Sequence, residues 1–70
     1  MTMRFTVEYE QEEDGRWLAE VPELPGVLAY GLTSEEAINK TQALALRVLA
    51  DRIEHGESAH EFVSISFAAA

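Results

Sequence analysis

The sequence contains no cysteine, only two prolines and only five basic residues, against thirteen acidic ones, in a chain of 70 residues. Without cysteine the chain forms no disulfide, and its two histidines do not form the Cys/His cluster of a structural metal site. A chain of this length is near the lower size limit for independent folding. We therefore expect one domain over residues 1–70 whose stability is completed by self-association or by a protein partner.

The charge balance narrows the class of partner. A net charge of −8 and an isoelectric point near 4.5 repel phosphate backbones and anionic lipid surfaces, so we expect no direct nucleic-acid binding and no membrane binding. An acidic surface attracts a basic protein, although a merely solvated surface has the same composition. No apolar run precedes Glu8, which argues against a signal peptide, and the lack of cysteine fits a cytoplasmic protein.

The first part of the chain alternates apolar and polar residues, the period of a half-buried strand. This alternation predicts strands over residues 3–10 and 16–21. The dipeptide Asp14-Gly15 between them supplies the positive φ that a hairpin turn requires. Residues 27–31 are predicted to form a short third strand at an edge of the sheet.

After the third strand the period changes to that of a helix. Thr33 and Glu36 have the spacing of a capping box, and Gly56 fits the position just beyond a helix C-terminus, which predicts a helix of about 22 residues. Residues 61–67 alternate again and are predicted to form the last strand, with residues 68–70 frayed.

This βββαβ order predicts an α+β fold of two layers. A right-handed crossover through the helix makes the last strand parallel to the first, giving a four-stranded mixed sheet of order 3-2-1-4 with the helix on one face. The other face is left to solvent or to an interface. Its apolar residues, together with those of a helix that is longer than the strands, predict the interface of a homo-oligomer, a dimer or a tetramer. The predicted oligomer interface consists of Leu18, Leu28, Tyr30, Leu49, Ile53 and Phe62.

Chemistry-bearing residues are sparse. Glu8, Glu10 and Glu20 fall on one sheet face and would fit the carboxylates of a metal-dependent nuclease, but the same spacing is typical of any polar outer face. His55 and His60 lack the spacing of a metal site and are expected to be solvated. We therefore expect no catalytic residue, no metal and no cofactor, and a protein that is not an enzyme.

Two segments resemble a known signature. The stretch DGRWLAEVPELPGV over residues 14–27, followed by GLTSEEA over residues 31–37, resembles the HicB-like antitoxin family, and the similarity extends over roughly residues 3–67. The resemblance implies a partial ribonuclease H-like fold. It also implies the function of a type II toxin-antitoxin antitoxin, which binds and covers HicA, a small basic RNA-cleaving toxin. Longer members add a DNA-binding segment after this domain, so we expect here a short, solitary domain that does not bind an operator.

The hairpin and loop of residues 14–26 and the acidic residues beside them are the most characteristic surface of the predicted antitoxin. Two other interpretations remain open: an orphan domain that associates only with itself, and the carboxylate-metal nuclease. The residues predicted to bind the toxin are Glu12, Glu13, Trp17, Glu20, Glu23 and Leu24.

Overall fold

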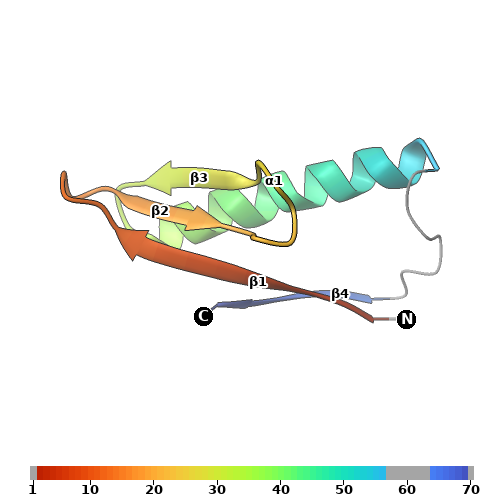
Figure 1. The fold of residues 1–70 in the computed structure, drawn as a ribbon, viewed down its shortest axis with the longest axis horizontal. Helices are drawn as coiled ribbons and strands as arrows, with labels where there is room; N and C mark the ends of the chain where they lie inside the picture. The colour runs from red at the N-terminus through yellow and green to blue at the C-terminus, as the bar shows by residue number, and fades with distance from the viewer. Residues whose placement is uncertain (1, 57–63, 70) are drawn as a thin grey trace.

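The structure, a computed structural model, describes residues 2–56 and 64–69 and has the predicted βββαβ order (Figure 1). The sheet order is β3-β2-β1-β4, with β1–β2 and β2–β3 antiparallel and β1–β4 parallel. The helix lies against one face of the sheet, so the predicted two-layer α+β fold is confirmed. The elements are β1 (Thr2–Gln11), β2 (Trp17–Glu20), β3 (Leu28–Gly31), α1 (Ser34–Glu54) and β4 (Ser64–Ala69).

The turn between β1 and β2 forms as the dipeptide predicted. Gly15 has φ +91°, and its N–H donates to the carbonyl of Glu12 at 3.0 Å. The N–H of Glu12 in turn donates to the carbonyl of Arg16 at 2.7 Å. Because a non-glycine residue is strained at this φ, Gly15 fixes the turn and, through it, the pairing of the two strands.

The start of α1 is held by side chains. Thr33 Oγ1 accepts from the Glu36 N–H at 3.0 Å, which satisfies a donor that the first turn leaves free. Glu36 Oε1 accepts from the N–H of Leu32, the residue before the N-cap, at 3.2 Å. The end of β3 lies directly beneath this turn. A Cβ at Gly31 would lie 2.5 Å from the backbone nitrogen of Ala37, so only glycine allows α1 to approach β3 so closely.

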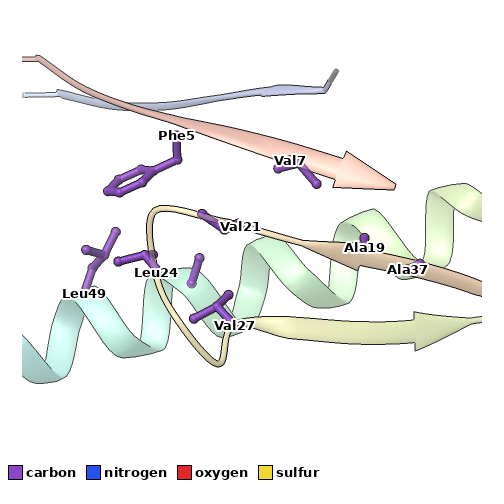
Figure 2. Packing of buried hydrophobic residues seen from close by; sticks show 9 residues of the cluster. Phe5, Val7, Ala19, Val21, Leu24, Val27, Ala37 and Leu49 are labelled. Atoms are coloured by element: carbon purple, nitrogen blue, oxygen red, sulfur yellow. The ribbon is translucent and has the colours of Figure 1, made fainter. Parts of the chain in front are cut away.

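The core lies between α1 and the inner face of the sheet (Figure 2). One polar side chain is buried there: Thr41, whose hydroxyl donates to the carbonyl of Ala19 at 3.0 Å. Among the described residues, no buried side-chain nitrogen or oxygen lacks a hydrogen-bond partner. The core consists of Phe5, Val7, Ala19, Val21, Leu24, Val27, Ala37, Ala45 and Leu49.

The last strand differs from its prediction. It was predicted over residues 61–67, whereas β4 runs from Ser64 to Ala69, and residues 61–63 lie outside the described part of the chain. Ala68 and Ala69 pair with β1, so the prediction that residues 68–70 fray is wrong for these two. Alanine has little preference for strands, but β1 is long enough to offer both residues backbone partners, and this pairing outweighs the preference.

Leu49 and Leu24 are both core residues, contrary to prediction. Leu49 was expected to extend beyond the sheet into an oligomer interface, but only 3% of it is exposed. The loop after β2 lengthens the sheet layer, because its Leu24, 2% exposed, points toward Leu49 and Phe5 (Figure 2). Leu24 therefore cannot act as a surface contact for a toxin. Ile53, one turn beyond Leu49, is 46% exposed.

Candidate protein-binding surface

The face of the sheet opposite α1 combines carboxylates with large apolar side chains. The strand register places Glu8 opposite Glu20 and Leu18 opposite Tyr30. Because side chains alternate across a strand, these residues share the face that α1 does not cover. We call this surface the outer face; it consists of Glu8, Glu10, Leu18, Glu20, Leu28 and Tyr30.

The apolar part of the outer face crosses β2 and β3. Leu18 is half-buried, whereas Leu28 is 44% exposed and Tyr30 is 41% exposed. The structure therefore brings together three of the residues predicted for an oligomer interface, while Phe62 lies outside the described residues. Adjacent exposed apolar side chains of this size are typical of interaction surfaces.

The acidic part of the outer face is slightly concave. A hollow of about 270 Å³ is lined by Glu8, Tyr9, Glu10, Leu18 and Glu20. Like charges directly opposite each other on paired strands destabilise a sheet, so the facing pair Glu8 and Glu20 does not contribute to the stability of the fold. A cationic group bound in this hollow would relieve the repulsion.

The surface continues at the end of the β1–β2 hairpin, where Arg16 lies. Arg16 Nε contacts Asp14 Oδ2 at 2.7 Å, and the guanidinium lies 4.3 Å from the centre of the Tyr30 ring. Hydrogen bonds from the Arg16 backbone N–H and then from its side chain lower the pKa of Asp14. Both contacts keep Arg16 next to the outer face. A second hollow, of about 320 Å³, is lined by Glu12, Glu13, Asp14, Arg16 and Tyr30.

The predicted toxin-binding residues do not all share one surface. Glu12 and Glu13 line the hollow at the hairpin end, and Glu20 lies on the outer face. Trp17 is opposite Gly31 in the register, on the inner side of the sheet, and its ring lies 6.3 Å from that of Tyr9. Trp17 therefore packs beside the core.

Glu23 has a structural contact that its sequence position did not indicate. Its carboxylate accepts from the N–H of Thr6 at 3.0 Å and 3.3 Å, at an edge of β1 beyond the part that pairs with β2. Hydrogen bonds from the backbone of Glu23 itself and from Thr6 lower the pKa of Glu23. An unpaired strand edge is open to other chains, and this carboxylate covers part of it.

The sequence placed Glu8 and Glu10 on one sheet face, either as a polar outer face or as metal ligands, but did not include them among the partner-binding residues. Within residues 2–56 and 64–69 no group of three or more His, Cys, Asp or Glu side chains is arranged to hold a metal ion, so the nuclease alternative has no cluster to support it. The histidine at the end of α1, His55, lies with Nδ1 2.8 Å from the carbonyl of Asp51, and His60 lies outside the described residues. The strand alternation is the signal that places both glutamates on the outer face.

Charge is distributed unevenly over the chain. Residues 8–23 contain seven carboxylates and one arginine, a net charge of −6, whereas α1 contains four carboxylates and three basic residues, a net charge of −1.

No helix in the described part of the chain is long and apolar enough to cross a membrane. Comparisons with protein-family models, with curated proteins and with solved structures found no match. The geometry and charge of the outer face are therefore the basis for its interpretation.

Proposed function

We propose that this chain is a cytoplasmic antitoxin of HicB-like type, which binds a small basic RNA-cleaving protein of HicA-like type and covers its active surface. The observation that carries the proposal is the outer face itself, where the Leu18 and Tyr30 side chains lie beside the facing pair Glu8 and Glu20. The first sequence segment that resembles the family, residues 14–27, contributes Leu18 and Glu20 to this face, and the second, residues 31–37, begins at the end of β3; both support the same interpretation.

The chemistry of the outer face suits a cationic partner. A protein that cleaves RNA presents lysine and arginine to the phosphates, and the carboxylates around the 270 Å³ hollow offer those side chains an alternative anion. Complementary charge speeds association and fixes orientation, while Leu28 and Tyr30 supply the desolvated contacts that provide most of the affinity. Inhibition occurs by occlusion, and no covalent step is involved.

Binding and inhibition test the proposal with a purified small basic RNA-cleaving protein of HicA-like type, to be sought first in the reading frames next to the one that encodes this chain. Purified partner and chain should form a stoichiometric complex that weakens as salt is raised, and the chain should stop RNA cleavage at the same ratio. No complex at low salt, or a complex that leaves cleavage unchanged, would contradict the proposal.

A matched pair of variants locates the surface. Glu8→Gln with Glu20→Gln removes two charges from the outer face, and Glu35→Gln with Asp51→Asn removes two from α1, so both leave the same net charge. We expect the first pair to weaken binding at least about tenfold, which corresponds to about 1.4 kcal/mol, and the second to have little effect. Equal losses from both pairs would indicate attraction by overall charge and not by the outer face.

A further inference from the structure

The side of α1 that faces away from the sheet has an apolar stripe of its own. Ala43, Leu46, Ala50 and Ile53 recur at intervals of three and four residues, and all four are exposed. Leu46 is 48% exposed and Ile53 is 46% exposed, although both belong to a 21-residue helix whose other side contacts β1, β2 and β3. Helix α1 therefore has exposed apolar side chains in addition to those that it contributes to the core.

The spacing of this outer helix stripe is that of a helix-pairing seam. Intervals of three and four residues keep side chains on one line along a helix, as at the a and d positions of a coiled coil. Small and large residues alternate along the line, in the order Ala43, Leu46, Ala50 and Ile53. A surface with this alternation fits a second surface that presents the large residues where the first presents alanines.

We propose that α1 pairs with α1 of a second copy of this chain, in antiparallel orientation, through the stripe of Ala43, Leu46, Ala50 and Ile53. A two-fold axis crossing the helices near Val48 places Ala43 opposite Ile53 of the second copy and Leu46 opposite its Ala50. Every large side chain then faces an alanine. A parallel pair would set alanine against alanine and leave gaps in two layers.

The charges beside the stripe favour the same arrangement. The antiparallel register brings Lys40 of each copy next to Glu54 of the other. Lys40 Nζ already contacts Glu36 Oε1 at 3.2 Å, so Glu54 adds a second carboxylate to an ion pair that is in place. Two copies thus gain one pair of opposite charges at each end of the helix pair.

Overall charge favours the helix over the outer face as the site of self-association. Two outer faces brought together would juxtapose six carboxylates, from Glu8, Glu10 and Glu20 of each copy. The arginines on this side do not balance them, because Arg16 already contacts Asp14 and Arg4 adds a single charge per copy. Two helices bring together surfaces with a net charge of −1 each. The pairing leaves the outer face free, so it is independent of the proposed toxin binding. Four side chains per copy form a small interface, which predicts a weak dimer that depends on concentration.

Sedimentation velocity over a concentration series tests the pairing, with a matched pair of variants. Leu46→Glu introduces charge into the stripe, and Leu28→Glu introduces the same charge at a leucine of similar exposure on the other side of the molecule. We expect the original chain to shift from monomer to dimer, Leu46→Glu to weaken dimerisation at least tenfold, and Leu28→Glu to leave it unchanged. A chain that stays monomeric at every concentration, or that loses its dimer only through Leu28→Glu, would overturn the proposal.

Charge exchange tests the orientation. Glu54→Lys should weaken the dimer, and Lys40→Glu combined with Glu54→Lys should restore it, because the exchanged pair again places opposite charges side by side. Thermal unfolding of each variant serves as the control that the fold persists. Failure of the double variant to recover dimerisation would contradict the antiparallel register. Toxin binding measured with Leu46→Glu should be unchanged, which separates this proposal from the proposed function.

Discussion

The two faces of the sheet are formed by the same strands but differ in residue type and in exposure. The inner face contributes small and medium apolar residues such as Val7 and Ala19, which are fully buried under α1. The outer face sets Glu8 opposite Glu20 and leaves Leu28 and Tyr30 partly exposed, an arrangement that costs stability. A sheet this small does not need acidic and apolar residues in one exposed cluster to fold. The alternation of side chains along each strand thus separates the residues that stabilise the fold from those that we propose for recognition.

The largest effect expected from this comparison comes from truncating matched leucines on opposite sides of the sheet. Leu49→Ala removes a buried side chain and should lower the free energy of unfolding by about 2–5 kcal/mol, because it leaves a cavity beside Phe5 and Leu24. Leu28→Ala, at an exposed position of the outer face, should change it by less than about 1 kcal/mol. Urea titrations followed by Trp17 fluorescence measure both values. Similar losses from the two variants would remove the distinction between the faces.

Gly31→Ala breaks the contact between the layers without changing either face. The added Cβ would lie 2.5 Å from the nitrogen of Ala37, so α1 must move away from β3, at a cost of about 1–3 kcal/mol in unfolding free energy. Gly56→Ala is the control, since its Cβ meets open space and only its φ of +68° is strained. Chemical denaturation should rank Gly31→Ala as the more damaging change. The opposite ranking would show that the close approach is not required.

Thr41→Val tests the buried polar contact that Thr41 of α1 makes with the sheet. Valine keeps the shape of threonine but removes the hydroxyl that donates to the Ala19 carbonyl, so we expect a loss of about 1 kcal/mol. Thr41→Ser, which keeps the hydroxyl and removes a methyl group, separates the hydrogen bond from packing. Hydrogen exchange of the β2 amides should quicken in the valine variant. Unchanged stability would mean that the contact is neutral.

The smallest effect concerns pH. Hydrogen bonds from the Leu32 N–H and then from Lys40 lower the pKa of Glu36 below its usual 4.5, so the folded chain binds this proton less readily than the unfolded chain. Stability from Glu36 is therefore present above pH 4.5 and is lost as pH falls through the lowered pKa. Glu36→Gln should flatten this part of the stability profile. Glu35→Gln, which removes a neighbouring carboxylate and leaves the capping contacts, should not flatten it.

The elements could be predicted because each carries a local signal. Alternation over β1, the dipeptide at Gly15 and the capping pair of Thr33 and Glu36 depend on neighbouring residues only, and all three were correctly interpreted. The position of Leu49 could not be predicted in this way. Its burial depends on the path of the loop that carries Leu24, and nothing near Leu49 in the sequence reports that path.

The candidate surface was predicted less completely than the fold. Leu18, Leu28 and Tyr30 follow from alternation and were placed on the correct face. Glu23 was interpreted as a toxin contact because it is acidic and lies in a characteristic loop, yet it binds the Thr6 N–H of a strand 17 residues away. A hydrogen bond between distant segments produces no periodic pattern in the sequence, so it can be seen only in the folded structure.

The parallel pairing of β1 with β4 has a consequence for the order of events during synthesis. Thr2 has Ser64 as its sheet neighbour, a residue that is added to the chain only after more than sixty others have followed Thr2. Until then the first half of β1 has no partner strand, although the β1–β2 hairpin is already complete. Contacts between segments as far apart in the sequence as β1 and β4 form slowly. We expect nascent chains that lack residues 64–69 to remain sensitive to protease in β1, and to become resistant once this last strand emerges.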